Sequence, residues 1–439
     1  MKTSTYPPIL LFFLFIVAPF SVLRSQETLY FPPVIGDDWE TISSQSLGWC
    51  DENIPQLYDY LEKRNTKAFI VLYDGKIALE HYFGSFTQDS IWYWASAGKS
   101  LTAFLVGLAQ QEGFLSISDS SSKYLGANWT SLTAQQEQKI TIRNQLTMTT
   151  GLKDNVSDPY CTLPECLIYK ADPDTRWAYH NAPYTLLDNV IESSTGQTLN
   201  DWFSSKVGKE TGIKGLFIRQ GYNNLFISNA RSFARFGLLI QNFGIWDGDA
   251  IMSDQNYFNE MVNSSQSINP AYGYLWWLNG KKHFMMPQTQ ITFNGSLMPS
   301  APSDLIAALG KNGQFLNIVP SRGLVLVRMG ESPTGNKVPM TLNDTIWQYM
   351  NQILCGTSVL DINRVDLQVY PNPVTEKLTV ISPFDQNKLD LSLFDLHGTL
   401  KRECLGRYQM DDLKNLPSGL YLLRIRYLNF EKFLKVNKL

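Results

Sequence analysis

The sequence predicts an α/β (α+β) fold, in which one antiparallel sheet is flanked by helices and followed by a small C-terminal β-sandwich. Strand patterns lie at the two ends of the larger domain, over residues 68–83 and 305–329, and helical patterns occur between them. After about residue 356 the chain changes to short strands and turns alone. A sheet built from both ends of a domain is therefore expected to precede a separate β domain.

Each element of the larger domain has its own local signal. Residues 68–73 and 76–83 flank the turn Asp74-Gly75, which predicts a β-hairpin. A helix is expected from Ser96 to Gln111, because large apolar residues recur on one helical face. The C-terminal half is predicted to add three strands and a closing helix, over residues 305–309, 314–319, 324–329 and 341–354.

The N-terminus has the pattern of an export signal. Lys2 precedes an apolar run over residues 9–20, and small residues follow over residues 21–25. This run is too short to span a bilayer core, which needs about 20 helical residues. We expect residues 1–26 to be a signal peptide, with a short membrane anchor as the alternative.

The tail is predicted to be a domain of its own. Short strand patterns over residues 378–381, 389–394 and 420–425 are separated by proline-rich turns. The chain is therefore divided into a signal peptide, a main domain, a linker and a tail, over residues 1–26, 27–356, 357–364 and 365–439.

The composition is that of a folded protein without a polyanionic partner. Hydrophobic residues make up 44% of the chain and charged residues 18%, which argues against extensive disorder. The net charge is -3 and no block of like charges occurs, so we expect no binding to nucleic acid. The histidines are scattered and no Cys-x-x-Cys pair is found, so we expect neither a metal nor a cofactor.

Two residues at the start of the first predicted helix can supply a nucleophile and its base. Ser96 and Lys99 are three residues apart, so their side chains lie on one helical face. A serine hydroxyl needs a base to remove its proton, and a buried lysine with a lowered pKa can act as that base. The same spacing recurs at Ser120 and Lys123, in a polar loop that we interpret as solvated. An ordinary N-cap serine is the alternative for Ser96.

Tyr179 and Asn181 form a second candidate pair. They stand at the entry to an apolar helical run. A phenol held near a lysine can share proton transfer, and an amide can position a substrate. Other Tyr-x-Asn patterns occur in this chain, and a structural role is the alternative here as well.

A third pattern, Lys311-Asn312-Gly313, lies at the start of a predicted strand. A glycine at this point lets a substrate approach the backbone closely. The N–H groups of Gln314 and Ser96 could then form an oxyanion hole. An ordinary β-turn is the alternative.

In this order, the three patterns resemble the active-site motifs of the penicillin-recognising serine enzymes, Ser-x-x-Lys, Tyr-x-Asn and Lys-Thr-Gly. The resemblance covers roughly residues 50–356, and its spacing suits the class C β-lactamase and esterase branch. It implies a β-lactamase/transpeptidase-like fold, with an all-helical lobe beside the sheet and the active site in the cleft between them.

The resemblance also implies roles for the individual residues. Ser96 matches the acylated nucleophile, Lys99 its base and Tyr179 a second proton shuttle. The substrate contacts would come from Asn181 and from the third motif with its neighbour, Lys311, Asn312, Gly313 and Gln314. Asn312 departs from the usual threonine, so recognition of a β-lactam carboxylate is not implied.

Two disulfides are expected in a chain that leaves the cytoplasm. The implied fold brings both ends of the main domain to the same side of the sheet, which suggests a pair between Cys50 and Cys355. Cys161 and Cys166 are close in sequence and are expected to form the second pair. Cys404 in the tail would then remain single.

The tail resembles a type IX secretion C-terminal sorting domain. The resemblance rests on Tyr-Pro-Asn-Pro at residues 370–373 and Ser-Gly-Leu-Tyr at residues 418–421. It implies that the type IX machinery carries the chain across the outer membrane and that the tail is then removed. A carbohydrate-binding β-sandwich is the alternative.

Together these features predict a secreted serine hydrolase that cleaves an ester or amide through an acyl-enzyme on Ser96. β-Lactamases and peptidoglycan peptidases act in the periplasm, so a location beyond the outer membrane favours an esterase or amidase. The alternatives are a β-lactamase, a D-amino-acid peptidase or amidase, and an inactive binding protein on the same scaffold. An α/β-hydrolase is disfavoured, because its Gly-x-Ser-x-Gly motif requires glycine where this chain has Trp94.

Overall fold

The computed structural model describes residues 29–332, 338–355, 367–381, 389–427 and 430–439. The predicted signal peptide (1–26) and linker (357–364) lie outside these residues. Among the residues described, no helix has both the length and the apolar character needed to cross a membrane. The main domain and the tail have separate hydrophobic cores.

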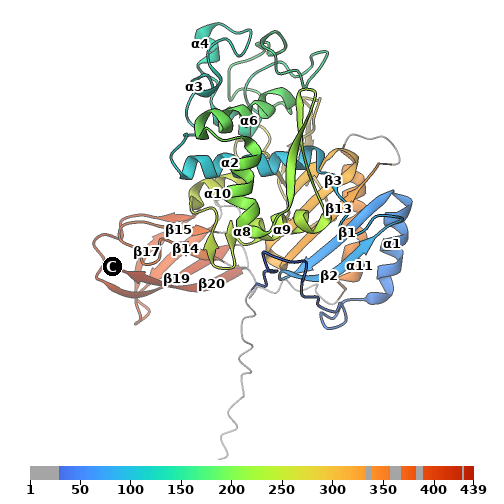
Figure 1. Cartoon of the computed structure of the whole chain (residues 1–439). Helices are drawn as coiled ribbons and strands as arrows, with labels where there is room; N and C mark the ends of the chain where they lie inside the picture. The colour runs from blue at the N-terminus through green and yellow to red at the C-terminus, as the bar shows by residue number, and fades with distance from the viewer. Residues whose placement is uncertain (1–28, 333–337, 356–366, 382–388, 428–429) are drawn as a thin grey trace, which may run out of the picture.

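The main domain is built around a six-stranded antiparallel sheet (Figure 1). Its strand order, β2-β1-β13-β12-β11-β8, places strands from both ends of the domain side by side. Ile70 of β1 lies opposite Val327 of β13, for example. The strands are β1 (Thr66–Tyr73), β2 (Lys76–Tyr82), β8 (Trp277–Leu278), β11 (Ile306–Gly310), β12 (Gln314–Val319) and β13 (Leu324–Gly330). The predicted antiparallel sheet built from both ends is thereby confirmed.

Helices cover both faces of this sheet (Figure 1). α1 (Ile54–Lys63) and α11 (Met340–Ile353) pack together on one face, and α9 (Ala230–Gln241) packs on β1, β12 and β13. α9 approaches closely because Gly237 has no side chain; a Cβ there would lie 2.4 Å from Val325.

The lobe is mainly helical, and its two long helices are α2 (Gly98–Gln111) and α6 (Asn181–Thr195). α2 is buried on nearly all sides because it packs against both α6 and the end of β11. The shorter helices are α3 (Ser122–Leu125), α4 (Ala134–Glu137), α5 (Ile142–Thr147), α7 (Leu199–Phe203), α8 (Lys209–Thr211) and α10 (Gln255–Met261).

The lobe also carries a small sheet that the sequence did not predict. Its order is β3-β5-β4, with bounds Trp92–Tyr93 for β3, Gly215–Gln220 for β4 and Asn223–Ser228 for β5. Two hairpins complete the domain: β6 (Ile245–Trp246) with β7 (Asp249–Ala250), and β9 (His283–Met285) with β10 (Thr292–Asn294).

The tail consists of two antiparallel sheets that share one apolar core. One sheet has the order β14-β15-β18 and the other β17-β16-β19-β20. Their bounds are β14 (Gln368–Tyr370), β15 (Leu378–Ile381), β16 (Asp390–Phe394), β17 (Leu400–Cys404), β18 (Gln409–Met410), β19 (Gly419–Tyr427) and β20 (Phe430–Lys438). The predicted β-sandwich is therefore present, with strands close to the expected positions.

Both predicted disulfides are present in the main domain. Cys50 and Cys355 have Cα atoms 5.8 Å apart, and those of Cys161 and Cys166 are 5.9 Å apart. Cys404 is a free thiol in the tail. The first bond closes almost the whole main domain into one covalent loop, whereas the second closes a short loop on the lobe.

We predict that the two disulfides contribute unequally to stability. In the chain-entropy model, a loop of about 300 residues is worth about 5–6 kcal/mol and one shorter than 15 residues about 3 kcal/mol or less. Replacing Cys50 and Cys355 with serine should therefore lower the free energy of unfolding more than replacing Cys161 and Cys166. Urea unfolding of both double variants without reductant measures the difference. A larger loss for the Cys161 and Cys166 variant would contradict this explanation.

Candidate active site

Ser96 lies in a tight turn that its neighbours hold in place. The turn, Ala95–Ala97, leads directly into α2. Ala95 has a φ of 49°, a left-handed conformation that costs a non-glycine residue roughly 1–3 kcal/mol. Trp94 fixes the turn from the preceding side: its indole N–H donates to Ser228 Oγ at 2.7 Å, and its backbone N–H donates to Phe226 O at 2.8 Å. The candidate nucleophile is thus anchored on β5.

Lys99 is one turn further along and contacts the serine directly. Its Nζ lies 2.9 Å from Ser96 Oγ, and the residue is only 2% exposed. Nζ also lies 3.9 Å from the ring centroid of Tyr184, which covers it from α6. Burial lowers the pKa of Lys99 to about 7, against an opposing effect of Asp188. A substantial fraction of Lys99 is therefore neutral near pH 7 and able to accept the Ser96 proton.

Tyr179 completes this group. Its ring centroid is 5.2 Å from Lys99 Nζ, and it stacks on Trp277 of β8 at a centroid distance of 5.9 Å. Burial raises the pKa of Tyr179 well above its usual value, and a hydrogen bond with Ser96 opposes that shift. The phenol is therefore protonated at neutral pH and suited to donate a proton. Ser96, Lys99 and Tyr179 are brought together, as the sequence predicted.

Asn181 is the first residue of α6. Its Oδ1 is buried and has no hydrogen-bond partner among the residues that the structure describes. Tyr184 and Asp188 follow on the same face of the helix, since residues three, four or seven positions apart align. A buried, unpartnered amide oxygen is consistent with the predicted substrate contact, which remains a prediction.

The third predicted motif needs a correction, because Gly310 rather than Gly313 approaches the nucleophile. A Cβ at Gly310 would lie 2.4 Å from Trp94 O and 3.2 Å from Ala97 N. A Cβ at Gly313 would instead lie 2.4 Å from the guanidinium of Arg328. The strand segment against Ser96 is therefore Ala308-Leu309-Gly310, at the end of β11.

The predicted role of Gln314 changes for the same reason. Its side chain is fully buried, and its amide group donates to Gly330 O at 2.7 Å, so it holds two strands together. Its backbone pairs with Gly310 across the β11–β12 hairpin. On the outer edge of β11, Leu305 O accepts from Asn279 N at 2.9 Å.

Because backbone groups alternate along a strand, Leu309 faces this same outer edge, and Gly310 is still extended (φ -122°, ψ 159°), so the N–H of Lys311 points to this edge as well. The N–H of Lys311, rather than that of Gln314, is therefore the candidate partner of the Ser96 N–H in an oxyanion hole. The Lys311 side chain is exposed at the turn. Asn312 donates from Nδ2 to Tyr93 Oη at 2.8 Å, which ties the turn to β3.

The loop around the second disulfide contributes a residue that sequence reasoning missed. Ala182 N donates to Pro159 O at 3.0 Å, so this loop lies against the start of α6. Tyr160, next to Cys161, lies close enough to Tyr179 to raise the pKa of that phenol. A tyrosine beside a predicted disulfide was the only available signal, and it does not identify a site without the fold.

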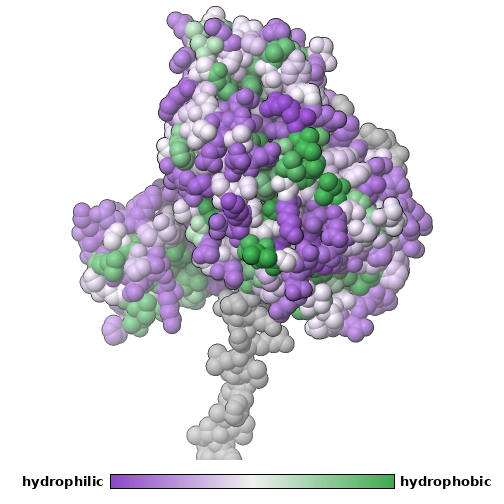
Figure 2. Space-filling model, viewed as in Figure 1, coloured by the Kyte–Doolittle hydropathy of each residue, from purple (hydrophilic) through white to green (hydrophobic). Residues whose placement is uncertain are grey.

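Apolar surface accompanies the site. Figure 2 shows a hydrophobic patch over the small sheet β3-β5-β4. Leu216 and Ile218 of β4 and Ile91 beside β3 are exposed large apolar residues. β3 leads directly into the Ser96 turn, so this patch adjoins the segment that carries the nucleophile.

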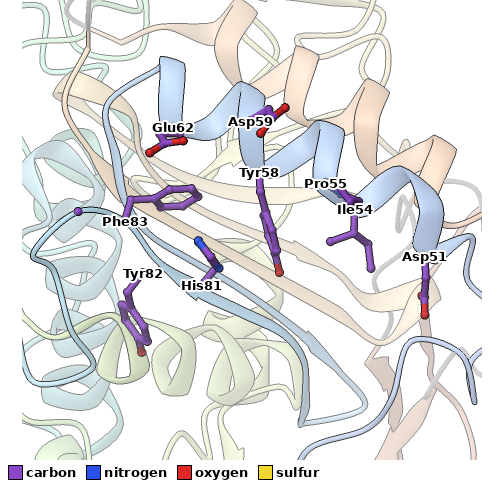
Figure 3. A pocket seen from close by; sticks show the side chains of 10 residues that line it. Asp51, Ile54, Pro55, Tyr58, Asp59, Glu62, His81, Tyr82 and Phe83 are labelled. Carbon is purple, nitrogen blue, oxygen red and sulfur yellow. The ribbon is translucent and has the colours of Figure 1, made fainter.

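A cavity of about 550 Å³ lies elsewhere, between α1 and β2 (Figure 3). Tyr58, His81 and Phe83 form its aromatic floor. β2 is at one edge of the main sheet, whereas β11 and β8 are at the other. The cavity is therefore remote from Ser96, and we assign it no part in the chemistry.

Comparisons with known proteins agree with this arrangement. A family model described as Beta-lactamase matches residues 57–350, about two thirds of the chain. A second model, described as a secretion system C-terminal sorting domain, matches residues 368–436. An uncharacterized protein of Alkalihalophilus pseudofirmus is 26% identical over 315 residues, which cover 63% of this chain and 86% of that protein.

Solved structures share the fold at low sequence identity. A Bacillus anthracis protein, provisionally assigned as a 6-aminohexanoate-dimer hydrolase, has a TM-score of 0.57 and 17% identity, covering 75% of this chain and 91% of its own. The β-lactamase/D-alanine carboxypeptidase of Pseudomonas syringae has a TM-score of 0.52 and 14% identity, covering 72% and 100%. These similarities establish the fold.

The corrected position of the third motif yields a test. We predict that Gly310→Ala slows labelling of Ser96 by a fluorophosphonate on the order of 10²-fold, because displacement of reacting groups by even 1 Å costs about that much. Gly313→Ala is the matched control: with a φ of 80° it should lower the melting temperature but leave labelling of the folded protein nearly unchanged. If Gly313→Ala slows labelling and Gly310→Ala does not, the third motif is Lys311, Asn312 and Gly313 after all.

Proposed function

Because this chain belongs to the beta-lactamase family, we propose that it is a serine hydrolase that cleaves an ester or amide through an acyl-enzyme on Ser96. The observation that carries the proposal is the 2.9 Å contact between Lys99 Nζ and Ser96 Oγ. Burial lowers the pKa of Lys99 to about 7, so the base is available without a metal or cofactor.

Acylation would proceed in one proton-coupled step. Neutral Lys99 takes the proton from Ser96 Oγ, and the oxygen attacks the carbonyl carbon of the substrate. The N–H groups of Ser96 and Lys311 stabilise the negative charge that develops on the carbonyl oxygen. Tyr179, whose phenol is protonated, donates to the departing oxygen or nitrogen as its bond to carbon breaks, and it recovers a proton from Lys99.

Deacylation would use the same groups in reverse. A water molecule attacks the acyl carbon, and its proton passes to the Lys99 and Tyr179 pair. The bond between Ser96 Oγ and the acyl carbon then breaks, and the serine regains a proton. The acid product leaves and the enzyme returns to its starting state.

The wall of the site supports an ester or amide substrate with apolar groups. The strand segment beside Ser96 is Ala308-Leu309-Gly310, which has neither the lysine nor the hydroxyl of a Lys-Thr-Gly motif. The exposed patch of Ile91, Leu216 and Ile218 lies beside the same turn. A β-lactam or D-amino-acid peptide, whose carboxylate needs a polar partner, is the second candidate substrate.

The tail is a secretion sorting domain, and it supports action outside the cell. We propose that the signal peptide and the type IX machinery deliver the enzyme across the outer membrane, to the surface or the medium. External esters or amides would then be accessible, whereas periplasmic targets would not. An inactive binding protein on the same scaffold would lack the Ser96 reactivity tested next.

The nucleophile can be identified directly. We expect a fluorophosphonate probe to add one adduct at Ser96, and Ser96→Ala to remove both the adduct and the hydrolysis of p-nitrophenyl esters. Ser120→Ala is the control, because Ser120 precedes Lys123 by the same spacing, while Lys123 forms an ion pair with Asp119 at 2.8 Å. Intact-mass and peptide analysis locate the adduct. An unchanged adduct in Ser96→Ala would reject the mechanism, and turnover of a chromogenic cephalosporin alone would favour the β-lactamase alternative.

The sorting domain should be dispensable for catalysis. The two cores are separate, so a chain ending at Gly356 should fold and keep its kcat/KM on small esters. In the native host the same truncation should leave the enzyme inside the outer membrane. Fractionation with activity assays measures both outcomes. Normal secretion of the truncated chain would show that the tail is not needed for sorting. A loss of activity on polymeric substrate alone would favour a carbohydrate-binding tail.

A further inference from the structure

A buried carboxylate, that of Asp188, lies one helical turn from the residue that covers the Lys99 amine. α2 carries Lys99 and packs against α6, which carries Tyr184 and Asp188 one turn apart on one face. The Tyr184 ring centroid is 3.9 Å from Lys99 Nζ. Both Lys99 and Asp188 are only 2% exposed. No sequence motif marks Asp188, which lies in the apolar run of α6.

The hydrogen bonds of Asp188 leave one oxygen unused. Oδ2 accepts from Asn224 Nδ2 at 3.0 Å, across from β5. Oδ1 is buried and has no hydrogen-bond partner among the residues described. A buried carboxylate is costly unless a positive charge or a proton offsets it. The charged groups that act on Asp188 are, in decreasing order of effect, Arg219 on β4, Glu192 on its own helix and Lys99 on α2.

We propose that Asp188 is a positioning residue for the acylation step: its carboxylate stabilises the ammonium that Lys99 becomes when it takes the Ser96 proton. The inference rests on the proposed function, because it concerns the base of that reaction. It deepens the proposal by giving the base a charge partner. Asp188 itself touches neither the nucleophile nor the substrate.

The electrostatics of the pair agree with this role. Burial is the largest effect on both groups: it lowers the pKa of Lys99 and raises the pKa of Asp188. Each group opposes the shift of the other, since a charged partner favours the charged form. The other groups facing Lys99, namely Ser96, Tyr179 and Tyr184, are neutral near pH 7. Asp188 is therefore the group that makes protonation of Lys99 easier.

The negative charge of Asp188, rather than its hydrogen bond with Asn224, is what the proposed role requires. Asn224 could be satisfied equally well by an amide oxygen, so packing and hydrogen bonding do not require a carboxylate. Arg219 is exposed on β4, where solvent screens its charge. Arg219 nevertheless acts on Asp188 more strongly than Lys99 does, whereas the charge that acts on the buried amine is that of Asp188.

The test is the pH profile of kcat/KM for a p-nitrophenyl ester in Asp188→Asn, which keeps the size of the side chain and the acceptor for Asn224. Because Lys99 and Asp188 both have a pKa of about 7, the acidic limb of the unmodified enzyme reports their coupled titration, and that of Asp188→Asn reports Lys99 alone. Without the carboxylate, Lys99 loses its proton at lower pH, so the limb should move down by about one pH unit or more. The plateau should fall on the order of 10-fold to 100-fold, because the ammonium formed in acylation is no longer stabilised.

Two further variants make the result decisive. Glu192→Gln keeps the acceptor for Leu199 N but removes a charge that raises the pKa of Asp188, so Asp188 is more fully ionised and the limb should move up, opposite to Asp188→Asn. Asn224→Ala removes the donor that favours the charged form of Asp188, so its limb should move in the same direction as in Asp188→Asn, but by less.

The outcomes separate the two proposals. Absence of Ser96-dependent turnover in the unmodified enzyme would reject the proposed function itself. Normal turnover with an unmoved limb in folded Asp188→Asn would overturn the present inference alone. If Asp188→Asn does not fold, an unmoved limb in Asn224→Ala overturns it equally.

Discussion

The burial of one amine is the constraint on which the site depends. Lys99 emerges from α2, a helix enclosed between the lobe and the end of β11, so its amine cannot keep a shell of water. The loss of hydration makes the charged form expensive and the neutral base available. Ser96 lies one helical turn before Lys99, which brings its hydroxyl into contact with the amine. Tyr184 on α6 and Tyr179 in the preceding loop cover the amine from the other side.

The opposite wall depends on a second close approach, at the β11–β12 hairpin. Gly310 lets β11 come against the Ser96 turn, where any side chain would collide with Trp94 O. Arg328, fully buried beneath the hairpin, donates to Gly313 O at 2.7 Å and to Arg64 O at 2.7 Å. Burial lowers the pKa of Arg328 to about 9, so it remains charged near neutral pH and its hydrogen bonds are charge-assisted. The turn is held in place because the guanidinium of Arg328 donates hydrogen bonds to its backbone carbonyl oxygens.

Local patterns explain which features the sequence predicts. The strands at both ends, the start of α2 and the Ser96–Lys99 spacing depend on neighbours within one turn or one hairpin, and the structure contains them. The predicted position of the third motif was wrong because Gly310 and Gly313 lie at the two ends of the same short turn, and their local sequences do not distinguish them. Only the contact with Trp94, more than 200 residues away, distinguishes them. Asp188 was not predicted for a related reason: the role of a single acid in an apolar helical run depends on the helix that packs against it, which the local sequence does not indicate.

The covalent organisation of the chain fits an enzyme that functions without its tail. Cys50 N donates to Ile353 O at 2.8 Å, and the disulfide with Cys355 fastens the first helical segment to the end of α11. Both disulfides lie before residue 356, and Cys404 in the tail is free. A cut between Cys355 and Leu367 would therefore break neither cross-link and divide neither core. Because no disulfide among the described residues joins the two domains, removal of the sorting domain would leave the covalent loop of the main domain intact.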